Sequence, residues 1–401
     1  MAERKNNNGS RRRRVRMLSV AVAAVSLIAI LVVKSDRATR ALASSHTRPV
    51  TVLKISDPVD IPGYGRPIAL AADPTRAGVW FLDASATDES IFFWNPSTSS
   101  LRKYSFGTDA SLPFGSQAAL TVDSSGVVWA GIGDTLLRLD PQNGLITRIA
   151  IPAVPSNTVL HGGPGGGPGE PPPLFDSHAV QALAMNRVGT LAIAMSFSTS
   201  VFLYDTTNQT FSNVALPDGD VPNDLSSLPN GTFVVAASST HGVDFVTPDH
   251  SVTHSDVSGY VVGCGKEFCV TSPDGHSLYT ITPSVAGSAS TLSPSVTRST
   301  VKSMQFLLGL KPTILTPSKV VVPTTKGFYV GNPSSGSGAQ YSLPARQCST
   351  MGVSNPSASV LPKTITCQQV PVDYVIDSAG NIWFTSNFGT SNIYEVSAGT
   401  Y

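Results

Sequence analysis

Hydrophobic and polar positions along residues 67–401 repeat one pattern, in which two short apolar runs flank a turn rich in Asp, Ser, Asn and Gly. The last copy is the clearest. An alternating run ends at Ile376, the turn is Asp377-Ser-Ala-Gly-Asn381, and the chain continues into Ile382-Trp-Phe384. Alternation on both sides of such a turn is typical of a β-hairpin. A third apolar run, 393–396, predicts a third strand.

Further copies of this unit occur upstream and can be aligned on one glycine of the turn. The glycines are Gly78, Gly126, Gly189, Gly231, Gly275, Gly327 and Gly380. Units of about 40–50 residues with several strands each favour a β-propeller. We therefore predict an all-β fold with seven blades of four-stranded antiparallel sheet.

Three tryptophans, Trp80, Trp129 and Trp383, stand two or three residues after a turn glycine. A large apolar side chain at a repeated position is expected to pack in the core between blades. The last unit has room for only three strands, and the run Val50–Ile55 has strand alternation without a partner. We expect this run to complete the last blade as its outer strand, which would close the ring and leave no open edge.

The N-terminal segment predicts a membrane anchor. Residues 1–16 form a basic tail, and residues 17–33 are apolar apart from two serines. Seventeen helical residues span about 26 Å, the short end of a transmembrane helix. Upstream arginines place the tail in the cytoplasm, so the chain would cross the cell membrane once, with the C-terminal domain extracytoplasmic. The alternative is a signal sequence cleaved after Ala43, which would make the protein secreted.

Composition agrees with an extracytoplasmic protein, because only 13% of the residues are charged and Gly and Pro are frequent. Residues 34–50 read as a linker and residues 51–401 as the propeller. Residues 1–40 contain ten Lys or Arg and two acids, so the remainder holds 17 basic and 24 acidic residues. This balance offers no basic face for nucleic acid. We expect a monomer.

The Gly/Pro-rich stretch 161–173 interrupts the repeat between the second and third units. It holds too few apolar residues to fold by itself, and we expect an irregular loop. A phosphate-binding loop is the functional alternative, but the stretch completes neither known glycine-rich phosphate motif.

Four cysteines fall into two close pairs, Cys264 with Cys269 and Cys348 with Cys367. An even number outside the cytoplasm favours disulfides. Local pairing is favoured among the three possible connectivities, because each pair lies within one unit. Neither pair has the spacing of a zinc site.

Two further groups have ligand chemistry. The segment 218–224 carries three carboxylates, Asp218, Asp220 and Asp224, that could hold calcium. It lacks the Asp-x-Asp-x-Asp-Gly pattern of a calcium loop, so an inter-blade turn is the favoured interpretation. His250 and His254 are four residues apart, but no helix is predicted to bring them to one face. A surface turn is favoured there.

The repeats resemble those of the virginiamycin B lyase (streptogramin B lyase) family of seven-bladed propellers. The likeness is carried by 377–385, and by 123–129 with 139–144. The resemblance implies elimination at an ester of a cyclic depsipeptide, with histidines and glutamates around magnesium at one mouth of the channel. Such a reaction needs a base, a cation for the enolate-like charge and an acid.

The chain departs from that family at the positions that matter for chemistry. Ser386 stands where the family often has Glu, and the first unit has Asp83 in that slot. His178, at the entry to the third unit, resembles the position of a catalytic histidine in the family. The favoured interpretation is a histidine without a catalytic role, at the start of a strand and exposed to the channel mouth.

The missing carboxylates favour a non-catalytic module that binds a small molecule or a cell-envelope partner at the propeller face. The alternative is a divergent streptogramin B-type C–O lyase with His178 and Asp83 as catalytic residues. Magnesium would be the cofactor only in that case. A sugar-lactone or quinoprotein-like enzyme has less support, because no constellation of acids lines the turns.

Overall fold

The structure is a computed structural model. It describes residues 59–60, 67–83, 89–107, 118–153, 179–196, 198–237, 242–255, 257, 260–264, 267–271, 277–282, 295–300, 313–316, 319–324, 327–332, 337–343, 346–349, 364–367, 371–386 and 392–398. For 59–60, 260–264, 267–271, 277–282, 295–300, 313–316, 346–349 and 364–367 the description covers the backbone alone. The chain divides into two units, Met1–Val50 and Thr51–Tyr401, and all described residues belong to the second.

The described residues form seven four-stranded antiparallel sheets, here called blades 1 to 7. Blade 1 contains β2 (Pro67–Ala72), β3 (Val79–Asp83), β4 (Ser90–Asn95) and β5 (Ser100–Ser105). Blade 2 contains β6 (Ala118–Val122), β7 (Val128–Ile132), β8 (Thr135–Asp140) and β9 (Leu145–Ala150). Blade 3 contains β10 (Val180–Met185), β11 (Thr190–Met195), β12 (Ser200–Asp205) and β13 (Thr210–Ala215). Blade 4 contains β14 (Pro222–Ser227), β15 (Phe233–Ala237), β16 (Val243–Val246) and β17 (Val252–Ser255).

The remaining blades continue in the same order. Blade 5 contains β18 (Tyr260–Cys264), β19 (Glu267–Thr271), β20 (Ser277–Thr282) and β21 (Ser295–Thr300). Blade 6 contains β22 (Thr313–Thr316), β23 (Lys319–Thr324), β24 (Gly327–Asn332) and β25 (Ser337–Ser342). Blade 7 contains β28 (Pro371–Ile376), β29 (Ile382–Ser386), β30 (Asn392–Val396) and β1 (Val59–Asp60). A separate pair, β26 (Arg346–Ser349) and β27 (Thr364–Cys367), lies between blades 6 and 7 in sequence, and η1 (Pro217–Gly219) is a 3-10 turn.

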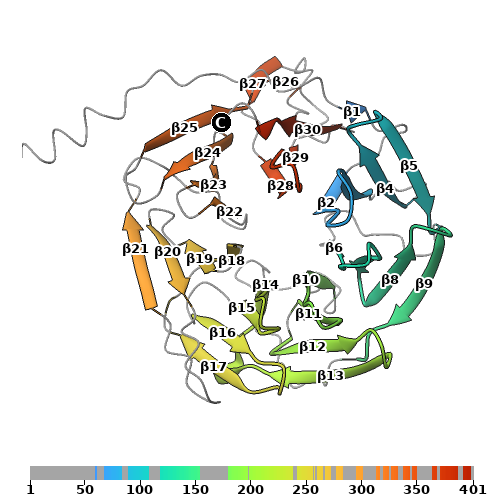
Figure 1. Cartoon of the computed structure of the whole chain (residues 1–401), viewed down its shortest axis with the longest axis vertical. Helices are drawn as coiled ribbons and strands as arrows, with labels where there is room; N and C mark the ends of the chain where they lie inside the picture. Colours follow the sequence, from blue (N-terminus) through green and yellow to red (C-terminus); the bar gives the residue numbers. More distant parts are fainter. Residues whose placement is uncertain are drawn as a thin grey trace, which may run out of the picture. The chain divides into compact units, whose positions relative to one another are not determined.

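The blades form a ring, which Figure 1 shows down its axis. The first strand of each blade is innermost and contacts the first strand of the next, from β2 through β6, β10, β14 and β18 to β22, and β28 returns to β2. Blades 6 and 7 join through aromatic packing, in which the Phe328 ring lies 5.3 Å from Tyr374 and 5.1 Å from Phe384. The predicted β-propeller architecture, with seven four-stranded sheets, is confirmed.

The hairpin turns explain why the repeat has its sequence. In blade 7 the Asp377 Oδ1 accepts hydrogen bonds from the backbone N–H groups of Ala379 and Asn381, both at 2.9 Å. Gly380 supplies the left-handed φ of 89° that ends the turn. The Trp383 Nε1 then donates to Asp377 Oδ2 at 2.9 Å. One aspartate therefore fixes both the turn and the orientation of the indole.

The same arrangement recurs in blades 1 and 2, where Trp80 donates to Asp73 at 2.9 Å and Trp129 to Asp123 at 3.4 Å. All three tryptophans are buried, as predicted. An indole in such a position removes 150–250 Å² from water, which stabilises the fold by about 4–6 kcal/mol. The hydrogen bond to aspartate satisfies its one polar atom.

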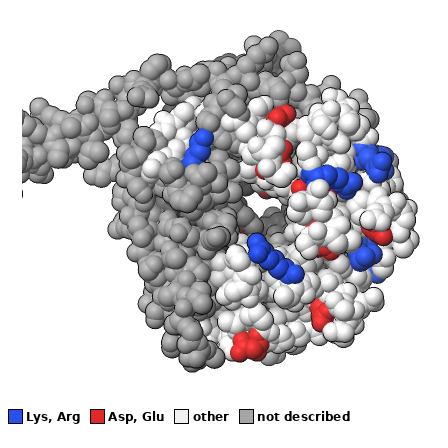
Figure 2. Space-filling model, in the orientation of Figure 1, with Lys and Arg blue, Asp and Glu red and all other residues white. Residues whose placement is uncertain are grey.

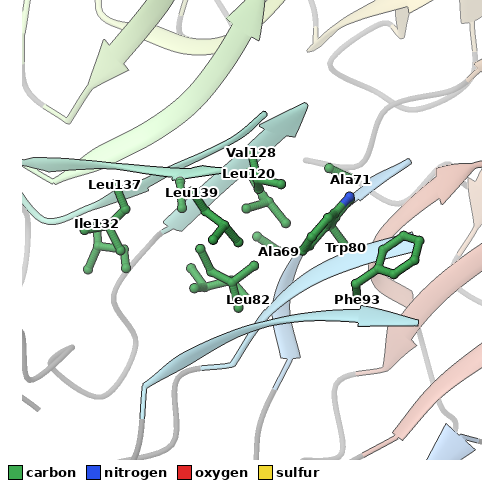
Figure 3. Close-up of a cluster of buried hydrophobic side chains, with 12 residues drawn as sticks. Ala69, Ala71, Trp80, Leu82, Phe93, Leu120, Val128, Ile132, Leu137 and Leu139 are labelled. Carbon is green, nitrogen blue, oxygen red and sulfur yellow. The ribbon is translucent and has the colours of Figure 1, made fainter. Parts of the chain in front are cut away.

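The core fills the wedges between neighbouring blades. Figure 3 shows the cluster between blades 1 and 2, where Trp80 and Leu82 of β3 face Leu120 of β6 and Leu139 of β8. Because both faces of a blade pack on neighbours, β3 and β7 are buried along their whole length. Such strands read as continuous apolar runs in the sequence.

The ring is closed by strand pairing across the two ends of the described chain. Val59 lies opposite Ile393 and Asp60 opposite Asn392, so β1 is the outer strand of blade 7. The predicted mode of closure is confirmed, but the strand is displaced from the predicted run 50–55, which lies outside the described residues. A second link is internal, because Leu70 N donates to Asp373 Oδ2 at 2.6 Å and joins the innermost strands of blades 1 and 7.

The alignment of the fifth and sixth units was wrong by one hairpin. In sequence, Gly275 stands between the second and third strands of its blade and Gly327 is the first residue of the third strand, whereas the other five glycines stand between the first and second strands. The first hairpins of these blades are connected by two residues only, 265–266 and 317–318. Such short connections leave no room for the Asp-x-x-Gly turn. The alignment therefore matched the turn glycine to the next hairpin of each blade instead.

Two predicted segments lie outside the described residues, the apolar stretch 17–33 and the loop 161–173. Within the described ranges, no helix has the length and apolar character needed to cross a bilayer.

The acid stability of blade 1 follows from Asp73. Burial raises the pKa of Asp73, but hydrogen bonds from Thr75, Arg76 and Trp80 outweigh it and hold the pKa below its ordinary value. A lowered pKa in the folded state adds stability above the unfolded pKa of about 3.9, and this stability is lost as the pH falls through the folded value.

We therefore expect Asp73→Asn to lower the free energy of unfolding by about 1–3 kcal/mol at pH 7, because charge-assisted hydrogen bonds are lost. The difference from the wild type should shrink below about pH 4. Denaturant unfolding followed by circular dichroism between pH 3 and 7 measures it. Asp123→Asn, with its longer bond to Trp129, is the matched control with a smaller effect. A deficit for Asp73→Asn that stays constant across this pH range would contradict the account.

Candidate functional site

One face of the ring collects the long connections. Each blade has four antiparallel strands, so the chain returns to the same face before it enters the next innermost strand. We call the face at which each innermost strand begins the start face. The connections 106–117, 151–179, 301–312 and 343–370 leave and re-enter strands there. On the opposite face the connections are mostly tight turns, with 283–294 as the exception.

Asp83 lies at the start face of blade 1. It is the last residue of β3, stands opposite Pro67 and Ser90 in the sheet, and is 3% exposed. Glu89, at the start of β4, is equally buried. His178 lies outside the described residues, and the strand that follows it, β10, belongs to blade 3. The pairing of His178 with Asp83 stays a prediction.

The cysteine pairs lie on neighbouring strands. Cys264 of β18 and Cys269 of β19 are two positions apart in register, because Cys264 faces Glu267 and Cys269 faces Val262. Cys348 of β26 and Cys367 of β27 have the same offset. No disulfide occurs among the described side chains, which do not include these four. The two local disulfides stay predictions.

Three ionisable residues meet at the start face between blades 3 and 4. They are Asp220, Asp244 and His254, and one ligand atom of each lies within 4.8 Å of the others. The His254 Nδ1 lies 2.8 Å from Asp244 Oδ1. Asp220 is 1% exposed and the Asp244 side chain 0%, whereas the imidazole is 33% exposed. The cluster is therefore buried on its acidic side and open at the histidine.

Each member is positioned by regular structure. Asp220 ends the 3-10 turn η1 on the crossover from β13 to β14, and its N–H donates to Pro217 O at 3.0 Å. Asp244 and His254 are directly opposite each other on β16 and β17. Val246, two residues after Asp244, packs in the core shared with blade 3. Side chains two apart on a strand share a face, so Asp244 points toward the crossover that carries Asp220.

Gly242 makes room for the imidazole. Its φ is +96°, and a Cβ at this position would lie 2.2 Å from the Ser255 carbonyl oxygen and 2.9 Å from His254 Cε1. A side chain here would displace the ring. The glycine thus serves both the backbone conformation and the site.

Among the described side chains, the other candidates from the same two segments do not join the cluster. His250 has a φ of 68° and sits in the β16–β17 turn on the opposite face. Asp224 accepts a hydrogen bond from Leu225 N at 2.7 Å. The side chain of Asp218 lies outside the described residues. The predicted inter-blade turn and the predicted surface turn therefore contribute one residue each, Asp220 and His254, to the same cluster.

Asp244 was not predicted from the sequence. It stands between Val243 and Phe245 in a four-residue strand that is buried throughout. A carboxylate in such a strand was the available signal, because buried acids are rare unless they are paired. Its partners lie 24 residues upstream and 10 downstream, so the cluster follows from topology rather than from spacing.

Electrostatics make the cluster unusual. Two carboxylate charges at most 4.8 Å apart repel by at least about 3.5 kcal/mol at an effective dielectric constant of 20. Opposite charge nearby would offset this repulsion. The cluster can exist in two forms. Either the imidazole hydrogen-bonds to a carboxylate, or a cation is bound by the two carboxylates and one imidazole nitrogen.

Comparisons with known proteins establish the fold. The chain matches no protein-family model, and no curated protein matches its sequence. Among solved structures, it is similar to a streptogramin B lyase, with a TM-score of 0.55 and 12% identity over 84% of this chain and 96% of that one. A catalytically inactive virginiamycin B lyase from Staphylococcus aureus with quinupristin gives 0.57 and 12%, over 85% and 98%.

The β-propeller domain of Cps50 (Swd1) from Myceliophteria thermophila is similar to the same degree, with a TM-score of 0.58 and 12% identity over 86% of this chain and 99% of that one. Structures with and without a lyase title thus match to a similar degree. At these identities the likeness shows the β-propeller fold alone.

Substituting Gly242 tests whether the glycine positions the imidazole. We expect Gly242→Ala to lower the melting temperature and to break the contact between His254 and Asp244, seen as a change in the imidazole ¹⁵N shifts by NMR. Gly219→Ala is the matched control. Gly219 has a φ of +76° with nothing within 4 Å of an added Cβ, so it pays only the backbone cost of about 1 kcal/mol. Equal effects of the two substitutions would refute the steric argument.

Proposed function

We propose that the protein is an extracytoplasmic β-propeller anchored in the cell membrane by residues 17–33, which binds a small molecule or a cell-envelope partner at its start face. The observation that carries this proposal is the placement of the long connections 106–117, 151–179, 301–312 and 343–370. In repeat folds, insertions on one face often mark the binding surface. The mostly tight turns of the opposite face offer less variable surface.

The roles of the aspartates support binding rather than catalysis. Asp373 binds the backbone of β2, and Asp73, Asp123 and Asp377 hold hairpin turns. These carboxylates build the ring. Asp83 alone occupies the position after a Trp-Phe pair at which the lyases that this chain resembles often have Glu. Its side chain is shorter than that of Glu.

Charge on the face drawn in Figure 2 favours no single class of macromolecule. Figure 2 shows basic and acidic side chains interspersed around a central opening. A mixed surface of this kind suits a neutral or weakly charged ligand, since a strongly charged one would need a field of one sign.

One experiment tests the face and the anchor together. A photo-cross-linking amino acid replaces Asp134, exposed on the start face of blade 2, or Gln142, exposed on the opposite face of the same blade. The full chain is irradiated in intact cells, and membranes are then washed with alkaline carbonate. We expect adducts from position 134 only, on protein that stays in the membrane pellet. Adducts from position 142 alone, equal adducts from both positions, none from either, or protein released by carbonate would contradict the proposal.

The lyase alternative has a separate readout. The full chain, purified in detergent, is incubated with a streptogramin B and magnesium. We expect no linear product by mass spectrometry. A linear product that disappears in His178→Ala and Asp83→Asn would replace the binding module by a divergent lyase.

A further inference from the structure

We propose that Asp220, Asp244 and His254 bind one divalent transition-metal ion, of the Zn²⁺ or Mn²⁺ class, at the boundary between blades 3 and 4. The three ligand atoms lie within 4.8 Å of one another and come from three different segments, the crossover, β16 and β17. Ligand atoms on one tetrahedral zinc lie about 3.4 Å apart. Side-chain rotation would have to shorten the longest separation, at most 4.8 Å, toward this value.

The charge of the cluster favours a cation. Both oxygens of Asp220 and the Oδ2 of Asp244 are closed off from solvent, so water does not screen their repulsion. A divalent ion between the three ligand atoms would attract both carboxylates and lower this repulsion.

The donor set selects the class of metal. Calcium and magnesium favour sites built from oxygen atoms alone, whereas an imidazole nitrogen with carboxylates suits zinc and manganese. The ion would take the place of the proton shared by His254 Nδ1 and Asp244 Oδ1. That proton leaves to solvent from an imidazolium, or moves to Nε2 in the neutral ring. Water would complete the coordination on the exposed side of His254.

The location gives such an ion a structural consequence. Asp220 belongs to the crossover that leaves blade 3, and its two partners belong to the outer half of blade 4. Leu216, from the same crossover, and Val246, from β16, belong to one core cluster shared by the two blades. Metal binding would therefore fasten these two blades together at the start face.

The experiment uses the full chain in detergent, freed of metal with EDTA. Zn²⁺, Mn²⁺, Mg²⁺ and Ca²⁺ are titrated separately, with binding followed by calorimetry and the melting temperature by circular dichroism. We expect one Mn²⁺ or Zn²⁺ per chain, a melting temperature raised by a few degrees at saturation, and at least tenfold weaker binding of Mg²⁺ and Ca²⁺. Titration with Mn²⁺ also distinguishes binding at this site from binding at the cysteines, because thiolates select softer metals.

Variants assign the ligands. Asp220→Asn and His254→Gln should each weaken Mn²⁺ binding at least tenfold. Metal-free Asp220→Asn should melt no lower than the metal-free wild type, because it removes one of two adjacent charges. A purely structural aspartate would give the opposite result. Asp224→Asn and His250→Asn, from the same two segments, are controls that keep full affinity.

Three outcomes would overturn the proposal. These are the absence of one-to-one binding of Mn²⁺ or Zn²⁺ at millimolar concentration, unchanged Mn²⁺ affinity in both ligand variants, and equal loss of affinity in the two controls.

Discussion

Closure of the ring is the constraint on which the rest of the structure depends. Seven wedge-shaped sheets bury their faces only if each has a neighbour on both sides, so the last blade must meet the first. The chain achieves this by pairing Val59–Asp60 with β30 and by a carboxylate bond from Asp373 to Leu70 N at 2.6 Å. Once the ring is closed, every innermost strand begins on one face. That face then receives all the crossovers between blades, including the crossover that carries Asp220.

Most of the ring could be predicted because its turns have a local chemical signature. The aspartate that caps the turn also binds the indole two or three residues beyond the glycine, which explains why Asp, Gly and Trp recur together. Where the connection shortens to two residues, in blades 5 and 6, this signature is lost, and the alignment slipped to the next hairpin. The closing strand was predicted in kind but not in place, because a two-residue strand such as β1 is too short for alternation to reveal it.

The candidate site shows the opposite balance between sequence and structure. Asp220 and His254 were each noticed, but in separate segments, and each alone favoured a turn. Asp244, which joins them, sits inside an apolar run. What the sequence lacked was the register that sets β16 against β17 and the wedge packing that brings the crossover onto blade 4. These are contacts between segments and have no local signature. Conversely, the resemblance to the lyase family holds for the fold, while its site residues remain predictions.

The account joins a proposed binding face, defined by its long connections, to a proposed metal-binding cluster on the same face. The most direct measurement is a crystal of the full chain soaked in Mn²⁺, with anomalous diffraction recorded near the manganese edge. The account predicts one anomalous peak between blades 3 and 4, about 2.2 Å from a carboxylate oxygen of Asp220 and of Asp244 and from a ring nitrogen of His254. An anomalous map without a peak at this position, in crystals where the three side chains are well ordered, would contradict it.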